Sequence, residues 1–259
     1  MMSEIIEWKA RWYNIVEKIR VIEDIAEEDA LIEELSQLSH ARVLGFVNSF
    51  AMNSMVNNAV FYHALYGADV VLRDGSGMSM LMTRLMVNKG LNMNGTDFIP
   101  KLLEAYRGRR VAFWGTEEPY LSDAAVSAKS KYGVDMVSVH HGFESEHVYV
   151  DLAIQHRPEL IVLGMGMPKQ EKIAAMIREL EMPVLIVCGG AIIDFMGNKI
   201  KRAPKWVRKI GFEWVYRLML EPKRLYKRYV LGNPIFMFRL LRMHRAAVIS
   251  SKLPISEKS

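Results

Sequence analysis

The acidic residue best placed for chemistry in this 259-residue sequence lies in a glycine-containing turn. Asp74 comes directly after the run 70–73 and begins the sequence Asp-Gly-Ser-Gly at 74–77. Glycine carries no side chain, so the backbone of such a turn can approach a ligand closely. A carboxylate held there can take a proton from a hydroxyl group. We therefore interpret Asp74 as a candidate general base, although an aspartate in this position also serves as a helix cap or turn former.

Other turns carry groups suited to binding a nucleotide or another anion. The segment 164–171 reads Gly-Met-Gly-Met-Pro-Lys-Gln-Glu, and the free amides of a helix that starts there can hold a phosphate or a uracil carbonyl. The segment 188–194 reads Cys-Gly-Gly-Ala-Ile-Ile-Asp. The candidate ligand-binding residues at such turns are Asn48, Gly75, Gly115, Gly164, Gly166, Gln170, Gly189, Gly190 and Asp194.

Two other kinds of site fit the sequence less well. A dinucleotide fingerprint that begins at Gly164 and Gly166 needs a third glycine at position 169, where Lys169 stands, and the acid expected at a following strand end is missing. A metal at His140 and His141 is disfavoured because adjacent side chains on a strand point to opposite faces and no Cys or Asp cluster completes a site. We therefore predict no metal and no cofactor.

The segments between these turns predict a parallel sheet. Short apolar runs without a polar face alternate with helical patterns of about ten to fifteen residues, which is typical of a parallel sheet covered on both faces. Ligands bind such sheets beyond the carboxyl ends of the strands, where the turns lie. We expect strands at 42–47, 70–73, 110–114, 135–140, 159–164 and 183–188, and helical segments at 4–38, 50–66, 76–87, 96–107 (capped by Thr96 or Asp97), 120–131, 146–155 and 169–180.

Charge divides the chain into unlike parts. Residues 199–259 hold 16 Lys and Arg against 3 Asp and Glu, whereas the other 198 residues hold 18 basic and 26 acidic side chains. Hydrophobic residues make up 51% of the sequence, which excludes a disordered chain. We predict a helical N-terminal extension over 1–40, a Rossmann-like α/β domain with helices on both faces of its sheet over 41–198, and a basic helical appendage over 199–259.

Aromatic residues are interleaved with the basic residues of the appendage. This mixture at helical spacing suits a segment that lies in a lipid headgroup layer, with rings in the interface and cations on phosphate. A basic helical subdomain packed on its own protein is the alternative, and nucleic acid fits less well. No apolar stretch approaches 18 residues and no signal-peptide pattern is present, so we expect residues 199–245 to lie on a membrane surface rather than to span it.

Taken together, the motifs closely resemble the WecG/TagA/CpsF glycosyltransferases, glycosyltransferase family 26. The resemblance spans about 42–240 in order and leaves the residues before 40 outside. It rests on the segments 74–75, 95–97, 141–143, 164–171, 189–206, 211–218 and 221–225.

The resemblance implies an enzyme at the cytoplasmic face of the bacterial inner membrane that assembles cell-surface polysaccharide. Such enzymes transfer a hexosyl unit from a UDP-sugar to a sugar on undecaprenyl diphosphate, with inversion at the anomeric carbon. The matching positions imply that Asp74 deprotonates the acceptor hydroxyl, with Asn48 in the donor pocket. They likewise imply Gln170 on the nucleotide side and Asp194 beside the same cleft. The basic residues that would close over the diphosphate are Arg217, Arg224 and Lys227 or Arg228.

The absence of an Asp-x-Asp triplet from residues 41–198 fits this assignment of cations. Many glycosyltransferases neutralise the departing diphosphate with a metal held by that triplet, and arginines can do so instead because they offer bidentate donors to phosphate. We therefore expect metal-independent transfer.

Two positions depart from the family pattern near the expected donor sugar. Phe46 stands where Thr is common, and Asn92 lies in a segment, 91–94, that lacks the usual basic residue. These departures suggest UDP-glucose as donor, with UDP-N-acetylmannosamine as the alternative. The sequence leaves open two rival classes, a non-catalytic peripheral membrane protein on a Rossmann-like scaffold and a nucleotide-binding oxidoreductase, and it permits a homo-oligomer.

Overall fold

The computed structural model describes residues 2–204, 206–207 and 212–244, and the side chains from residue 8 onward. Of the predicted basic appendage, residues 205, 208–211 and 245–259 lie outside the described residues.

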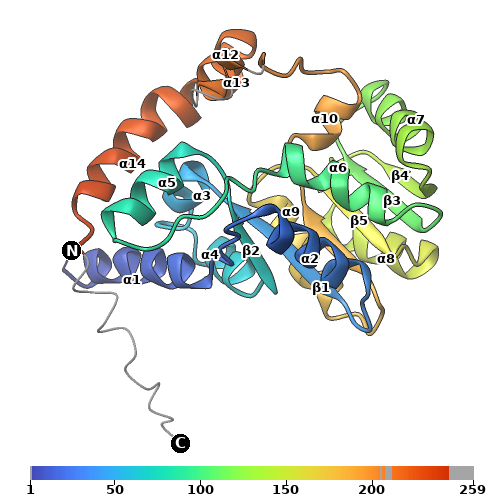
Figure 1. The fold of residues 1–259 in the computed structure, drawn as a ribbon, viewed down its shortest axis with the longest axis horizontal. Helices are drawn as coiled ribbons and strands as arrows, with labels where there is room; N and C mark the ends of the chain where they lie inside the picture. Colours follow the sequence, from blue (N-terminus) through green and yellow to red (C-terminus); the bar gives the residue numbers. More distant parts are fainter. Residues whose placement is uncertain (1, 205, 208–211, 245–259) are drawn as a thin grey trace, which may run out of the picture.

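A six-stranded sheet forms the centre of the described residues (Figure 1). Its order is β2-β1-β6-β5-β3-β4, and every neighbouring pair is parallel. The strands are β1 Arg42–Val47, β2 Val70–Arg73, β3 Arg110–Gly115, β4 Asp135–His140, β5 Leu160–Gly164 and β6 Leu185–Cys188. The predicted Rossmann-like α/β fold is confirmed, because a parallel sheet needs crossover helices that cover both of its faces.

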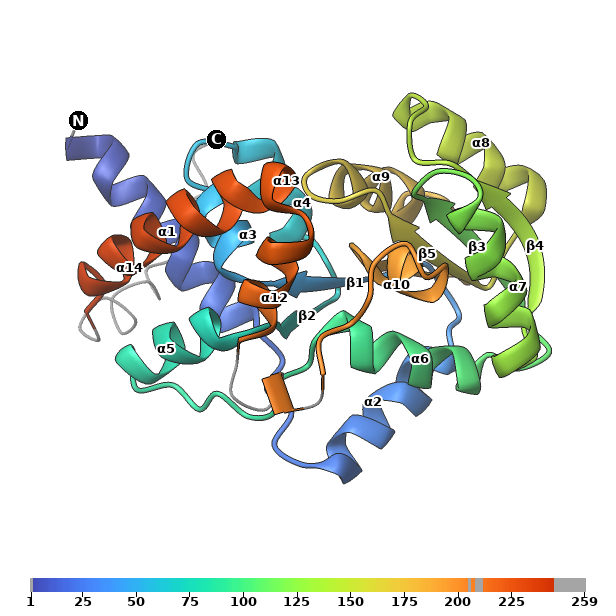
Figure 2. The ribbon, with the colours of Figure 1, turned by 90° about the horizontal axis from the view of Figure 1, so that it is seen from above.

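Two hydrophobic clusters lie on the two faces of the sheet, because alternate side chains of a strand point in opposite directions. In β1, Val43 and Val47 join one cluster, while Leu44 and Phe46 join the other. Figure 2 shows the two helical layers from above. The first cluster includes α1 Met2–Lys18, α3 Ser49–Ser54, α4 Ala59–Tyr66, α5 Ser76–Arg84, α8 Glu146–His156 and α9 Lys169–Arg178; the second includes α2 Ile25–Ser36, α6 Gly95–Ala105, α7 Tyr120–Tyr132 and α10 Ile192–Met196.

Asparagine caps explain two of the differences between the predicted and the observed helix boundaries. The helix expected over 50–66 is two helices, because the Asn58 side chain accepts a hydrogen bond from Phe61 N at 2.9 Å and starts α4. The cap of α6 is Asn94, whose Oδ1 accepts from Asp97 N at 3.0 Å. Neither Thr96 nor Asp97 is the cap, so that prediction was wrong.

The first forty residues pack against the sheet domain. Trp12 of α1 is fully buried, and its indole Nε1 donates to Met52 O at 2.8 Å. Ile19 pairs with Val71 of β2 as an isolated parallel bridge, so the edge of the sheet next to β2 is partly covered.

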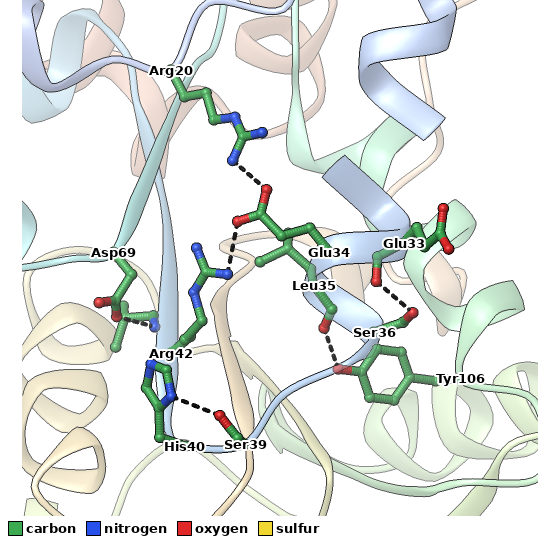
Figure 3. Close-up of polar contacts among 11 residues, drawn as sticks. Arg20, Glu33, Glu34, Leu35, Ser36, Ser39, His40, Arg42, Asp69 and Tyr106 are labelled. Carbon is green, nitrogen blue, oxygen red and sulfur yellow. Dashed lines mark hydrogen bonds and ion pairs between the residues drawn. The ribbon is translucent and has the colours of Figure 1, made fainter. Parts of the chain in front are cut away.

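Polar contacts fasten α2 to the amino ends of the strands (Figure 3). The carboxylate of Glu34 pairs with Arg20 at 2.5 Å and with Arg42 of β1 at 2.8 Å. The Tyr106 hydroxyl donates to Leu35 O at 2.6 Å. The helical N-terminal extension thus contributes to both layers of the domain.

The C-terminal helices lie across one end of the molecule, beside α3 and α5 (Figure 1). They are α12 Glu213–Leu220, α13 Pro222–Tyr226, the π-helix η1 Lys227–Leu231 and α14 Gly232–Leu241.

The inner face of α14 belongs to the first hydrophobic cluster. Phe236 and Leu240 are buried there, and the ring of Phe236 stacks on Trp12 with centroids 5.3 Å apart. The Tyr13 hydroxyl of α1 donates to His244 O at 2.7 Å. The appendage therefore packs on its own protein along this face. No helix among the described residues is long and apolar enough to cross a membrane.

Candidate active site

Two cavities meet at the carboxyl ends of the strands, and Asp74 lines both of them. The glycine-walled cavity, about 290 Å³, is bounded by the turns after β5 and β6, including Gly164, Gly166, Gly189 and Gly190. The aromatic cavity, about 370 Å³, lies between the turn after β2 and the C-terminal helices. The residues that line both are Asn48, Phe50, Asp74, Thr96, Arg217 and Arg228.

Asn48 positions the carboxylate of Asp74. Its Oδ1 caps α3 by accepting from the backbone N–H groups of Phe50 and Ala51, both at 3.1 Å. That arrangement directs its Nδ2 toward Asp74, to which it donates at 3.3 Å. The neighbouring ends of β1 and β2 thus bring together two residues that lie 26 positions apart in the sequence.

The surroundings of Asp74 perturb its protonation. Burial raises the pKa of this carboxyl, because a charged group loses hydration deep in the cleft. The hydrogen bond from Asn48 and the positive charges of Arg228, Arg217 and Arg73 act in the opposite direction and favour the ionised form. A carboxylate with a raised pKa is a stronger base than an exposed one, as proton abstraction requires.

Hydrogen bonds hold the turn that carries Asp74 at the N–H and the carbonyl of Gly75. The N–H of Gly75 donates to Asn92 Oδ1 at 2.7 Å, and its carbonyl accepts from the buried guanidinium of Arg73 at 3.2 Å. Gly75 has φ of 88°, a left-handed conformation that favours glycine. Arg73 also donates to Lys89 O and Gly90 O, so the loop before Asn92 is fixed to the same turn.

Two arginines from the C-terminal helices reach the junction of the cavities. The guanidinium of Arg217 lies 5.3 Å from the Phe195 ring centroid, and that of Arg228 lies 4.8 Å from the Phe50 ring centroid. The Nε atom of each is buried without a hydrogen-bond partner among the described residues. Burial lowers the pKa of Arg228 but leaves an arginine charged at neutral pH. Buried cationic donors of this kind are suited to an anionic ligand.

The other predicted cations differ in position. Arg224 lines the glycine-walled cavity and is paired through Nε and Nη2 with the carboxylate of Glu221, with Nε and Oε1 2.7 Å apart. Lys227 begins the π-helix, is exposed and lines neither cavity. Of the two alternatives for the third cation, Arg228 lines both cavities and Lys227 lines neither.

Gln170 joins the two glycine turns. It lines the glycine-walled cavity, yet its Oε1 accepts from the N–H groups of Gly166 and Gly190, each at 3.2 Å. Its Nε2 donates to the buried Glu171 at 2.8 Å, and burial raises the pKa of that carboxyl to about 7. Gln170 therefore braces both turns, a role that its position in the sequence did not reveal.

Asp194 has polar partners that the sequence analysis missed. Its Oδ1 accepts from the Thr116 hydroxyl at 2.5 Å and lies 3.6 Å from Lys199 Nζ. All three residues line the glycine-walled cavity. Thr116 directly follows β3, so the rule that ligands gather at the carboxyl ends of strands was a signal that could have found it.

Three further predicted positions differ in which cavity they line. Gly115 lines neither cavity; a Cβ there would lie 2.6 Å from the Gly164 carbonyl carbon, so it allows β3 and β5 to approach closely. Phe46 is buried and lines the glycine-walled cavity. Asn92, expected near the donor sugar together with Phe46, lines only the aromatic cavity. Within the described part of the chain, no group of three His, Cys, Asp or Glu residues is placed to hold a metal ion.

Comparison with known proteins decides the family. The model of the glycosyl transferase WecG/TagA/CpsF family matches residues 18–248, most of the chain. This chain belongs to that family. Because the match begins at residue 18, it includes α2, which the sequence resemblance had left outside.

This WecG/TagA/CpsF glycosyltransferase resembles proteins of Staphylococcus aureus. It is 26% identical over 204 residues to an N-acetylglucosaminyldiphosphoundecaprenol N-acetyl-beta-D-mannosaminyltransferase of strain NCTC 8325 / PS 47, covering 76% of this chain and 79% of the relative. Relatives of the same name in strains COL and MRSA252 match to the same extent. The predicted class of enzyme, a glycosyltransferase, is thereby confirmed.

Proposed function

We propose that this glycosyltransferase transfers a hexosyl unit from a UDP-sugar to a sugar carried on undecaprenyl diphosphate, with inversion, during assembly of a bacterial cell-surface polysaccharide. The printed name of the relatives supports the class of acceptor, because it describes a sugar on diphosphoundecaprenol. The observation that carries the proposal is the position of Asp74 at the junction of two cavities, with Arg217 and Arg228 lining both.

The arrangement supports a mechanism in which one base activates the acceptor hydroxyl and several cations stabilise the leaving diphosphate. Asp74 takes the proton from an acceptor hydroxyl as that oxygen forms the bond to the anomeric carbon. The bond from that carbon to the UDP oxygen breaks and its electron pair stays on the oxygen, so the diphosphate leaves with one more negative charge than it carried in the donor. Arg217, Arg228 and, once released from Glu221, Arg224 stabilise that charge in place of a metal ion.

The donor nucleotide fits the glycine-walled cavity. Its glycine turns allow the backbone to approach a diphosphate, and Lys199 and Arg224 add positive charge to its lining. Phe46 gives the wall an apolar ring where an N-acetyl group would need fixed donors, so UDP-glucose is the first donor to test and UDP-N-acetylmannosamine the second.

The outer surface of the C-terminal helices supports attachment to the cytoplasmic face of the inner membrane. Met219 is 77% exposed, Leu241 59% and Phe238 56%. Residues 199–245 contain 14 Lys and Arg against 2 acids. Of the described cations, Lys223, Lys227 and Arg242 are exposed on or next to the same helices. Such a combination binds anionic lipid at about 1 kcal/mol per charge near the surface.

A donor panel tests the proposal. Purified protein is mixed with UDP-glucose, UDP-N-acetylmannosamine or other UDP-sugars and a short-chain lipid-diphosphate-linked sugar, and product and UDP release are measured with and without EDTA. We expect transfer from one donor that EDTA leaves unchanged. Loss of transfer in EDTA with rescue by Mn²⁺ removes the metal-free mechanism. The lack of both transfer and a thermal shift with UDP favours a non-catalytic membrane protein, and a shift with NAD or NADP alone favours an oxidoreductase.

A further inference from the structure

The aromatic cavity contains groups that the chemistry at Asp74 does not use. Trp214 of α12 and Tyr229 of the π-helix meet edge to face in its lining, with ring centroids 5.8 Å apart and 61° between the ring planes. Aromatic rings provide a large apolar surface with a defined geometry. The C–H groups of a sugar ring can pack on such a surface while the sugar hydroxyls keep their hydrogen bonds.

Uncharged polar side chains from other elements line the same cavity. Ser76 and Asn92 come from the turn and loop after β2, and Asn233 comes from α14. The oxygen of Asn92 accepts from Gly75 N, so its NH₂ group is the part that can donate to a ligand. A few convergent uncharged polar groups beside aromatic rings are typical of a site that orients a neutral polar ligand.

The two cavities differ in their charged lining residues. Among their described lining residues, Lys199, Arg224 and Asp194 belong only to the glycine-walled cavity, and the charged residue found only in the aromatic cavity is the acid Glu213. Lys199 lies 3.2 Å from Glu117 and Arg224 pairs with Glu221, while Glu213 lies 3.7 Å from Arg202. An anionic ligand in the glycine-walled cavity can draw Lys199 and Arg224 from their partners, whereas the described cations that line the aromatic cavity, Arg217 and Arg228, are shared with its neighbour. The aromatic cavity therefore suits the uncharged substrate group.

We propose that the aromatic cavity is the subsite for the acceptor saccharide, and that Trp214 determines acceptor specificity by stacking on its ring. This inference rests on the proposed function, in which Asp74 deprotonates a hydroxyl of that saccharide. The diphosphate and the lipid chain of the acceptor stay outside the cavity, beside the exposed apolar residues of the C-terminal helices.

Substitution of Trp214 tests this assignment with a short-chain, water-soluble acceptor. We expect Trp214→Ala to raise the KM for the acceptor at least tenfold while the Kd for UDP stays within twofold. Trp214→Phe, which keeps a ring, restores most of the loss and guards against an effect of misfolding. Trp206→Ala is the matched control, because it removes the same side chain from the same region but lines neither cavity; it leaves both constants unchanged.

Calorimetry without a donor distinguishes the sugar from the lipid. We expect Trp214→Ala to weaken binding of the short-chain acceptor about tenfold and to leave binding of farnesyl diphosphate, which has no sugar, unchanged. Equal weakening of both ligands assigns the cavity to the isoprenyl chain and overturns the proposal, as does a rise in the UDP Kd that matches the rise in acceptor KM. If the wild type transfers no sugar, the proposed function fails, while this binding comparison still decides the saccharide subsite.

Discussion

At the scale of single residues, Asp74 is the group on which the proposed reaction depends most directly. Asp74→Asn keeps the shape of the side chain and its contact with Asn48 but removes the base. We expect turnover to fall by roughly 10²–10⁴, the usual contribution of a general base, with the Kd for UDP nearly unchanged. Asp123→Asn is the control, because Asp123 is an exposed residue in the first turn of α7. A variant at position 74 that keeps most of its activity removes Asp74 from this role.

A second prediction at the residue scale concerns the pH dependence of activity, which follows from the protonation of Asp74. Burial raises its pKa, and the base must be ionised, so kcat/KM rises with pH through a pKa above that of an ordinary aspartate. Asn48→Ala removes the hydrogen bond that lowers this pKa, while Arg73, Arg217 and Arg228 remain.

The rising limb of the pH profile of Asn48→Ala should therefore move to higher pH than that of the wild type. Asn58→Ala provides the matched control, since Asn58 caps α4 in the same way but lies away from Asp74. An unchanged limb in Asn48→Ala contradicts the assignment of that limb to Asp74.

At the scale of elements, the π-helix that carries Arg228 is held by one side chain of α3. Asn53 Nδ2 donates to Gly232 O at 2.7 Å, just after the π-helix, and Arg239 of α14 donates to Asn53 Oδ1 at 2.8 Å. Single π-turns are frequent at functional sites, where the extra residue redirects a side chain. Asn53 thus holds the element that carries Arg228 to the junction of the cavities.

We expect Asn53→Ala to lower turnover several-fold and to weaken UDP binding, because Arg228 loses its fixed position. Loss of two hydrogen bonds should also lower the free energy of unfolding by about 1–3 kcal/mol. Asn57→Ala changes an exposed asparagine in the turn that follows α3, and it should alter neither quantity. If Asn53→Ala loses stability but keeps wild-type turnover and UDP affinity, Asn53 supports the fold and not the site.

The strands could be predicted from the sequence more fully than the polar contacts of the site. The bounds of β1, β2 and β4 were predicted correctly, because buried parallel strands leave an apolar run that local sequence reveals. Asn48 and Asp74 directly follow β1 and β2, and the rule that ligands bind at the carboxyl ends of strands predicted both as candidates; the structure places them together at the junction of the cavities. The bracing by Gln170 and the clamp by Asn53 could not be predicted, because each joins segments whose proximity only the tertiary fold creates.

At the scale of the whole molecule, the C-terminal helices are part of the hydrophobic core as well as of the site. Phe236 of α14 is buried against Trp12 of α1, whereas Phe238 on the same helix is 56% exposed. Phe236→Ala should lower the free energy of unfolding by about 3–5 kcal/mol, the usual cost of removing a buried phenyl ring. Phe238→Ala should leave it within about 0.5 kcal/mol.

Chemical denaturation of the wild type and the two variants in the absence of lipid measures these free energies of unfolding. Equal stability of Phe236→Ala and the wild type would show that α14 contributes nothing to the core in solution. A stability loss confined to Phe236→Ala, with vesicle binding reduced in Phe238→Ala, assigns the inner face of α14 to folding and the outer face to the membrane.

The hydrogen bond between Tyr13 and His244 joins residues 231 positions apart. During translation Tyr13 and Trp12 of α1 therefore leave the ribosome long before His244 and Phe236 are synthesised, so the Trp12 indole lacks the ring that stacks on it in the folded protein. Contacts between such distant segments close late and slow the folding of a chain. Arg217 and Arg228 follow Asp74 in the sequence, so a nascent chain has the carboxylate before the cations, and the proposed site is complete only after α12 and the π-helix have left the ribosome.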